Sequence, residues 1–160
     1  MAAGSKTTTL PPAFQPDHFF LARTEGRGIV RDLTGRLIDC CAITTVGRWD
    51  HDYGALRFDE TYVYDTDGAT DVLNWSFGPD AQGRMSASEA GIKEKVRGWA
   101  DGPDYRLRFQ RRGGPRGEKL NLTYNVRFSL MAPDLALKVA QISLLGLTIA
   151  TMTAVHRRLE

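Results

Sequence analysis

The stretch that decides the fold is ALRFDETYVYDTD, Ala55–Asp67, in which apolar and polar side chains alternate. One set of alternate positions holds Leu56, Phe58, Glu60, Tyr62 and Tyr64, and the other holds Arg57, Asp59, Thr61 and Asp65, with Val63 as its apolar exception. Because successive side chains of a strand point to opposite faces, this stretch predicts a strand with one face in a core and one in water. Its buried face carries a carboxylate, Glu60, among aromatic rings.

The same period of two recurs along most of the chain, between turn signals such as Thr34-Gly35, Asp67-Gly68 and Gly113-Gly114-Pro115. The runs of strand type span residues 26–32, 36–49, 55–65, 70–77, 84–90, 92–100, 105–112, 119–131 and 147–158. Short strands separated by turns at this spacing predict an all-β fold, either an antiparallel sandwich or a barrel. The run 119–131 is long enough to cross a whole barrel wall obliquely.

Leu135–Leu145 fits two structures. Read with a helical period, the segment has Asp134 as its N-cap and one apolar stripe, formed by Leu135, Val139, Ile142 and Leu145. Read with a period of two, the residues on one strand face are Leu135, Leu137, Val139, Gln141, Ser143 and Leu145. The pattern alone slightly favours the helix.

The composition is that of one ordinary globular domain. The chain has 160 residues, of which 42% are hydrophobic and 25% charged, so its core needs no metal or disulfide to hold it. The net charge of +2 is too small to indicate nucleic-acid binding, and we expect no nucleic-acid partner. We divide the chain into a flexible N-terminal lead (1–18), a folded β domain (19–158) and a terminal pair (159–160) that is typical of a cloning scar or is the native end.

The cysteines and the chain termini bear on the cellular compartment. Cys40 and Cys41 are adjacent, and neighbouring strand side chains point apart, so we expect no disulfide between them. No Cys/His spacing is typical of a zinc site. The sequence has no apolar run long enough for a membrane helix, and Met1–Pro16 lacks a secretion or lipoprotein signal. These features predict a cytoplasmic protein, with association to the cell envelope as the alternative.

A series of motifs in a fixed order resembles a known family. The motifs are Gly26-x-Gly28-x-x-x-Asp32-x-x-Gly35-Arg36, Gly47-Arg48-Trp49-Asp50, Leu56-x-x-Asp59-Glu60-x-x-x-Tyr64-Asp65, Asp67-Gly68, Trp75, Gly98-x-Ala100-x-Gly102, Tyr105 and Arg157-Arg158. Their order resembles a bacterial family of unknown function that includes proposed lipoproteins and consists of small lipocalin-like proteins. The resemblance implies a calycin-like barrel, and it turns the preference at Leu135–Leu145 toward a strand. We therefore expect a single antiparallel lipocalin-like β-barrel of about eight to ten strands.

Two positions depart from the family pattern. The resemblance implies an arginine two residues before Trp75, where this chain has Leu73. It also implies an acidic-aromatic cluster in the long late strand, where this chain has Asn125–Phe128. If the family has a polar interior site, these departures indicate that this member has altered it.

Glu60 is the first candidate for a functional role. A lone buried carboxylate is costly, so it must be paired, hydrogen-bonded or protonated. It either anchors a ligand inside the barrel or has a structural role, paired with an arginine such as Arg48 or in contact with water at the barrel mouth. The predicted apolar walls of the ligand site are Phe58, Tyr62, Trp75, Phe109 and Tyr124. The alternative for these rings is plain core packing.

Two further features invite a functional interpretation. His156 on the last predicted strand could ligate a haem, but a lone histidine near a chain end is more often a surface residue, and we expect no cofactor or metal. A basic hairpin region consists of Arg106, Arg108, Arg111, Arg112, Arg116 and Lys119. These side chains either meet phosphates or an acidic partner, or they form a solvated outer face.

Three functions remain in order of preference. The leading hypothesis is a non-enzymatic protein that binds a small apolar or amphipathic molecule inside the barrel, with Glu60 as its polar anchor. The alternative is a structural or interaction module with a filled barrel, whose basic hairpin contacts an acidic partner or a membrane surface. The third is an enzyme that uses Glu60 as acid or base, which ranks last because no second carboxylate clearly shares its face.

Overall fold

The computed structural model describes residues 10–112 and 120–160. Within these residues it contains one short helix, α1 (Pro16–Phe19), and ten strands. The strands are β1 (Arg23–Asp32), β2 (Leu37–Asp50), β3 (Ala55–Tyr64), β4 (Thr70–Pro79), β5 (Met85–Glu89), β6 (Arg97–Asp101), β7 (Asp104–Arg112), β8 (Asn121–Ala132), β9 (Leu135–Leu144) and β10 (Leu147–Arg158).

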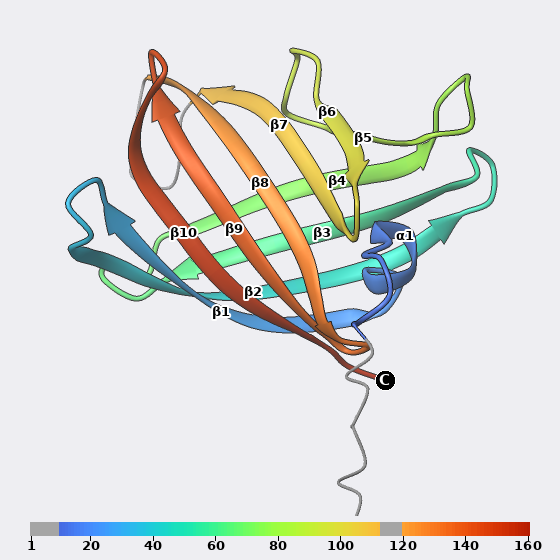
Figure 1. Ribbon diagram of the computed structural model, residues 1–160, viewed down its shortest axis with the longest axis horizontal. Coiled ribbons are helices and arrows are strands. Elements are labelled where there is room, and N and C mark those ends of the chain that lie inside the picture. Colours follow the sequence, from blue (N-terminus) through green and yellow to red (C-terminus); the bar gives the residue numbers. More distant parts are fainter. Residues whose placement is uncertain (1–9, 113–119) are drawn as a thin grey trace, which may run out of the picture.

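All ten strands belong to one antiparallel sheet with the order β5-β4-β3-β2-β1-β10-β9-β8-β7-β6. Apart from β1 and β10, paired neighbours in this sheet are also neighbours in sequence, so hairpins connect them. The β1–β10 pairing runs from Thr24 opposite Arg158 to Asp32 opposite Ala150, and it joins the two ends of the chain. It curls the sheet into a nearly closed barrel (Figure 1), so the predicted all-β antiparallel barrel is confirmed.

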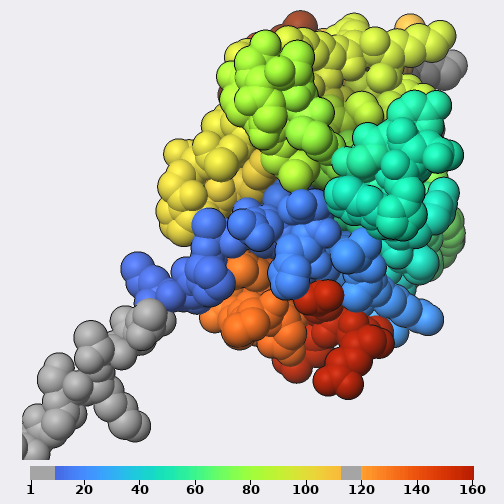
Figure 2. Space-filling view, turned by 90° about the vertical axis from the view of Figure 1, so that its right-hand side faces the viewer, coloured from blue at the N-terminus to red at the C-terminus, as the bar shows by residue number. Residues whose placement is uncertain are grey.

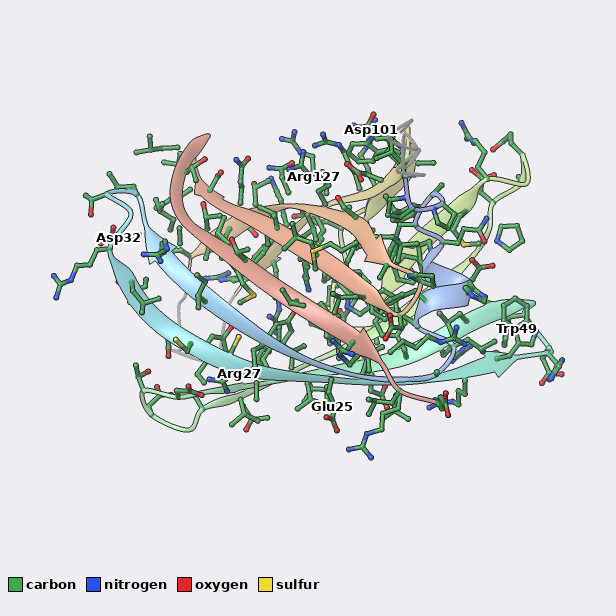
Figure 3. The ribbon with its side chains drawn as sticks, turned by 60° about the horizontal axis from the view of Figure 1, so that its bottom comes forward. Glu25, Arg27, Asp32, Trp49, Asp101 and Arg127 are labelled. Carbon is green, nitrogen blue, oxygen red and sulfur yellow. The ribbon has the colours of Figure 1, made fainter. Side chains whose placement is uncertain are left out.

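The alternation of side chains decides what fills the barrel. In β3, Phe58 and Glu60 are buried, and the residues between and beside them are more exposed, as the sequence predicts. Charged side chains such as Glu25, Arg27 and Arg127 lie on the outer surface of the wall (Figure 3). The long strand β8 follows the same rule, with Leu122, Val126 and Phe128 buried and Arg127 exposed.

Leu135–Leu144 is the strand β9, so the helix that the pattern slightly favoured is wrong and the strand implied by the resemblance is confirmed. The inward face of β9 holds Ala136, Lys138 and Ala140, which are not the large apolar residues that usually mark a core face. Because the inward positions of β9 hold small residues and a lysine, its apolar residues do not mark the core face, and the period of two does not indicate it. The strand pairs with β8 on one side and β10 on the other, so its backbone hydrogen bonds are satisfied in the sheet.

The two edge strands, β5 and β6, are only five residues long each. The predicted strand 92–100 forms only in its second half, as β6, because Ile92 and Val96 pack against the core from an irregular segment. At the end of β5 the Glu89 carboxylate accepts hydrogen bonds from the backbone N–H groups of Asn74 and Gly91, at 2.9 and 2.7 Å. The Glu89 side chain therefore satisfies backbone N–H groups that a neighbouring strand would otherwise pair at that point.

Residues 10–20 close one end of the barrel. Phe14, Phe19 and Phe20 are almost fully buried, and the Phe20 ring stacks on Phe58 inside the barrel with a centroid distance of 4.4 Å. The space-filling view of this end shows the N-terminal segment in the centre, surrounded by later parts of the chain (Figure 2). We expected residues 1–18 to lie outside the fold as a flexible lead, but within that range Phe14 and Pro16 are buried against the barrel end.

Gly47 lets α1 approach the wall. A Cβ atom at this position would lie 1.7 Å from the carbonyl oxygen of Phe20, which no side chain can tolerate. The backbone of Phe20 therefore rests directly on β2. Among residues 10–112 and 120–160, no helix has the length and apolar character to cross a membrane.

Candidate binding site inside the barrel

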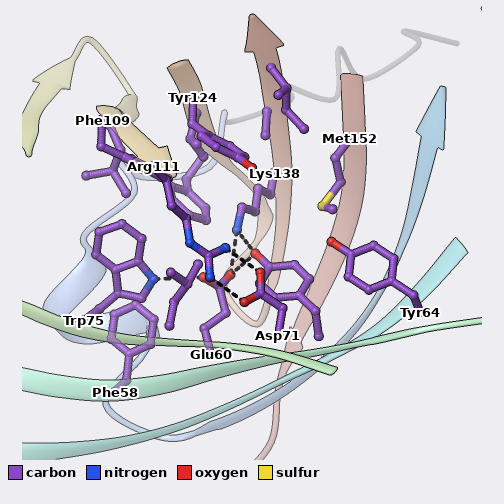
Figure 4. Close-up of a pocket in the computed structure, with 17 residues that line it drawn as sticks. Phe58, Glu60, Tyr64, Asp71, Trp75, Phe109, Arg111, Tyr124, Lys138 and Met152 are labelled. Carbon is purple, nitrogen blue, oxygen red and sulfur yellow. Dashed lines mark hydrogen bonds and ion pairs between the residues drawn. The ribbon is translucent and has the colours of Figure 1, made fainter. Parts of the chain in front are cut away.

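An internal cavity of about 60 Å³ lies between β3 and β4 on one side and β7, β8, β9 and β10 on the other (Figure 4). All six residues that the sequence predicts for ligand binding line this cavity: Phe58, Glu60, Tyr62, Trp75, Phe109 and Tyr124. The structure thus brings the predicted set together on neighbouring strands. That these residues bind a ligand stays a prediction.

Glu60 is the centre of a buried hydrogen-bond network. Its Oε1 accepts hydrogen bonds from the Tyr62 hydroxyl and the Lys138 ammonium, both at 2.6 Å, and its Oε2 accepts one from the Trp75 indole N–H at 2.9 Å. The Lys138 ammonium also donates to the Tyr62 hydroxyl oxygen and lies over the rings of Tyr62 and Phe128. The carboxylate is therefore paired and hydrogen-bonded rather than stranded in an apolar core.

The surroundings keep Glu60 ionised. Burial on its own raises the pKa of this carboxyl, but the Lys138 charge and the hydrogen bonds from Lys138 and Tyr62 outweigh it, and the pKa is lowered. Burial and the neighbouring Glu60 charge raise the pKa of Tyr62 well above its ordinary value, so this phenol stays protonated and donates to the carboxylate.

Lys138 is the partner that the sequence analysis missed, and the suggested pairing of Glu60 with Arg48 is wrong. Arg48 is exposed on β2. Lys138 looked like an interruption of an apolar segment, and it comes 78 positions after Glu60. Its inward direction could have been inferred only by accepting β9 as a strand, because it then alternates with Leu137 and Val139.

Arg111 belongs to the barrel interior and not to the basic surface where the sequence analysis placed it. It continues the inward face of β7 after Leu107 and Phe109, and it lines the cavity. Its guanidinium forms a two-pronged ion pair with Asp71 of β4, and both side chains are largely buried (Figure 4). Hydrogen bonding and the charge of Asp71 raise the pKa of Arg111 above its already high ordinary value despite burial.

The remaining members of the predicted basic region are separated from one another. Arg106 pairs with Asp101 in the neighbouring hairpin, and Arg108 and Arg112 are exposed. Arg116 and Lys119 lie outside the described residues. The described part of the region therefore consists of two exposed arginines, one arginine in a local ion pair and one internal arginine.

Aromatic rings form a large part of the cavity walls. The rings of Phe109 and Tyr124 stack with centroids 5.0 Å apart, and the Trp75 ring meets Phe109 edge-on at 5.3 Å. Trp49 and Trp99 have exposed fractions of 39% and 41% and do not line the cavity. Trp75 is thus the tryptophan that contacts the cavity.

A second cavity of about 110 Å³ adjoins the first, at the barrel end opposite α1. The two cavities share the side chains of Tyr64, Tyr124, Ile142 and Met152, which form the partition between them. Asp39 lines the second cavity and accepts a hydrogen bond from the Thr66 hydroxyl at 2.9 Å. Side chains, and not backbone, therefore lie between the two cavities.

The comparisons with known proteins agree with this architecture. A model of the family described as "Protein of unknown function (DUF3833)" matches residues 3–158. The chain belongs to the DUF3833 family. No curated protein sequence matches it.

Two solved structures have the same fold as this DUF3833 protein. One is an S-type phycobiliprotein lyase from Guillardia theta, with a TM-score of 0.66, 10% sequence identity, and coverage of 92% of this chain and 94% of the lyase. The other is a protein of unknown function of the DUF3598 family from Nostoc punctiforme, with a TM-score of 0.66, 13% identity, and coverage of 96% of this chain and 53% of that chain. At these identities the likeness shows the shared lipocalin-like fold.

His156 of this DUF3833 protein is fully buried, so the expectation of a surface histidine is wrong. It shares the inward face of β10 with Met152 and Ala154, and its ring meets Phe20 edge-on. Burial and the Lys138 charge lower the pKa of His156 to about 4, against a smaller opposite effect of Glu60. Neither cavity is lined by His156, so this geometry gives no support to a haem at its ring.

Other chemistry suggested by the residue types receives no support from the described residues. Among them, no group of three or more His, Cys, Asp or Glu side chains is placed to hold a metal ion. Cys40 and Cys41 are both free thiols, and burial raises the pKa of Cys41 to about 11. Leu73, where the resemblance implies an arginine, adds an apolar side chain to the cavity wall.

Proposed function

We propose that this protein binds a small amphipathic molecule inside its barrel. The observation that supports the proposal is the composition of the inner cavity, where aromatic walls surround two ion pairs, Glu60–Lys138 and Asp71–Arg111. Binding pockets for small molecules typically combine apolar walls with a few convergent polar groups. The deep Glu60 network is already satisfied, so we assign it to shaping the floor of the site and not to anchoring the ligand.

The size of the cavities limits the ligand. Together they offer less space than the roughly 300 Å³ that a drug-sized ligand requires. An apolar cavity of about 150 Å³ can hold a benzene ring. We therefore expect a compact ligand with one ring or a short chain, which occupies both cavities after the partition moves. Met152 suits such movement because its side chain is unbranched and adaptable.

The alternative functions fit the site less well. A basic docking surface is less well supported, because Arg111 lies in the interior and Arg106 is paired with Asp101. An acid–base enzyme would need a carboxyl whose pKa lies near the working pH, whereas the pKa of Glu60 is lowered by its partners. A fold shared with a phycobiliprotein lyase also favours a role with a small organic molecule over a purely structural one.

Trp75 provides a direct test. In a Trp49→Phe/Trp99→Phe variant, Trp75 is the remaining tryptophan, and it contacts the cavity. Titration with benzyl alcohol should change its fluorescence along a saturable curve, with a dissociation constant of about 0.1–1 mM for so small a ligand. Ala140→Leu, which fills the cavity from β9, should abolish the change.

Gln141→Leu is the matched control, because it adds the same side chain to the outer face of the same strand. Its binding curve should equal that of the parent. A linear, non-saturating response, or saturation that persists in Ala140→Leu, would contradict the proposal.

A further inference from the structure

The barrel wall has an open seam below its two short edge strands. β5 pairs with β4 only from Trp75 onward, and β6 pairs with β7 only up to Arg108. In the part of the chain that the structure describes, no backbone ladder therefore joins residues 70–73 of β4 to residues 109–112 of β7. The ion pair between Asp71 and Arg111 spans the seam instead.

Arg111 lies between the inside and the outside of the barrel at this seam. Together with Leu73 it lines both the inner cavity and an outer groove of about 920 Å³. The groove walls also include the polar side chains of Asn74, Gln110 and Asn121, two acidic residues, Glu89 and Glu94, and two further basic residues, Lys93 and Arg112. A ligand whose apolar part fills the inner cavity would thus place its polar group at the Arg111 guanidinium, where cavity and groove meet.

The guanidinium has donors to spare. An arginine carries five N–H donors, and the pair with Asp71 uses one on each terminal nitrogen. Among the described residues, no hydrogen bond occupies the Nε–H or the two remaining terminal N–H groups of Arg111. A group that accepts hydrogen bonds would fit these donors.

The charges around the cavity favour an acceptor without charge. Glu60 is balanced by Lys138, and Asp71 by Arg111, so the walls carry no surplus charge. A carboxylate or an ammonium placed between the cavity and the groove would lose part of its hydration without gaining an unpaired counter-charge. A hydroxyl or carbonyl group accepts the same hydrogen bonds at a much smaller desolvation cost.

We infer that the ligand carries an uncharged hydrogen-bond acceptor, and that the seam at Arg111 is the site that recognises it. The inference rests on the proposed function and names the chemical class of the ligand. It also assigns Asp71 a role in specificity, because Asp71 cancels the charge that would otherwise make Arg111 a carboxylate site.

Three probes of nearly equal size test the inference at pH 7.5 with the Trp75 fluorescence readout. Benzyl alcohol is uncharged, benzoate is an anion and benzylamine is a cation. We expect the parent protein to bind benzyl alcohol at least tenfold more tightly than either ion. Asp71→Asn should improve benzoate binding at least tenfold, because Arg111 then lacks a counter-charge. Arg111→Gln should instead improve benzylamine binding, because Asp71 then lacks one.

The outcomes separate the two proposals. If none of the three probes binds the parent protein, the proposed function fails and the inference fails with it. If the parent protein prefers benzoate or benzylamine, the inference is overturned while the proposed function stands. The inference is also overturned if the ratio of the benzoate affinity to the benzyl alcohol affinity is the same in Asp71→Asn as in the parent protein. The comparison of probes on the parent protein does not depend on the folding of any seam variant.

Discussion

The Glu60–Lys138 pair shows how one buried interaction sets the character of the interior. Both side chains are at least nine-tenths buried, so removal of one partner leaves a charge in a low-dielectric environment. We expect Lys138→Met to lower the free energy of unfolding by about 3–5 kcal/mol and to raise the pKa of Glu60, because burial then acts with less opposition. Urea unfolding at pH 7 measures the loss.

A double mutant identifies the cause of that loss. Glu60→Gln/Lys138→Met removes both charges and keeps an acceptor for Trp75, so it should be more stable than the sum of the two single losses predicts. Lys95→Met, at an exposed lysine, is the control and should be close to neutral. Additive losses in the double mutant would show that packing, and not charge, governs this site.

His156 predicts a dependence of stability on pH. Its pKa falls from an ordinary value of 6.5 to about 4 in the folded protein, because burial and Lys138 disfavour the charged ring. Between these two values the unfolded chain binds a proton that the folded protein does not. Stability is therefore complete above pH 6.5 and decreases as the pH falls toward 4. We expect a loss of about 2 kcal/mol between pH 6.5 and pH 5 from this ring.

Urea unfolding of the wild-type protein and of His156→Gln at pH 7 and pH 5 measures this contribution. The variant should lose most of the dependence over that interval. The pKa of Glu60 is also depressed, so its contribution is lost only as the pH falls below the ordinary carboxyl value of 4.5, outside this interval. An equal slope in both proteins would rule out His156 as the origin.

The alternation of side chains predicted the direction of a residue well where apolar residues point inward and charged residues point outward. The sequence-based prediction failed where a charged residue such as Arg111 points inward. Phe58, Trp75 and Phe109 follow the period of two and all reach the cavity. Arg111 continues the same inward series in β7, so the alternation predicts its inward direction, whereas its charge alone predicts an outward one. Lys138 had no such local signal, because its partner is set by closure of the barrel.

At the scale of elements, the contact between Phe20, which directly follows α1, and Gly47 of β2 is the most direct test of the packing. Gly47 leaves no room for a side chain, and the neighbour that would have to move is backbone, not a flexible side chain. We expect Gly47→Ala to cost at least about 3 kcal/mol and to loosen residues 10–20 from the barrel end. Thermal unfolding and limited proteolysis near the N-terminus would detect both effects.

Gly91→Ala is the matched control for that substitution. Its added Cβ meets only the Glu89 carboxylate, at an ordinary 3.4 Å, and its backbone needs no left-handed conformation. The control should be close to neutral. If Gly47→Ala were as stable as Gly91→Ala, the docking of α1 on β2 would have to be abandoned.

The strands also show when the sequence can predict the bounds and the inward face of a strand. β3 and β8 have large apolar residues at alternate positions, so their faces could be predicted. β9 presents small residues and one lysine to the interior, and its strand state depends on pairing with β8 and β10. β6 begins five residues later than predicted, because Ile92 and Val96 are partly buried against the core without being in a strand. Tertiary contacts decide such segments.

At the scale of the whole molecule, the open seam makes stability uneven around the barrel. β1 and β10 are paired on both sides, whereas residues 70–73 and 109–112 depend on side chains to stay together. The Asp71–Arg111 pair is the strongest of these contacts, since it is two-pronged and largely buried. Local opening of the barrel should therefore begin at the seam.

Hydrogen exchange of the native protein tests this view. In Arg111→Met, amides in 70–79 and 104–112 should exchange about tenfold faster than in the wild type, because the opening free energy of the seam falls by about 1.4 kcal/mol. Amides in 23–32, at the centre of the sheet, should keep their rates. Arg106→Met removes an ion pair at the far end of β7 and should affect only the β6–β7 hairpin. If the amides of 70–79 exchanged faster in both variants, loss of any arginine on β7 would loosen the sheet. If exchange in Arg111→Met were unchanged, apolar contacts such as that between Trp75 and Phe109 would hold the seam closed.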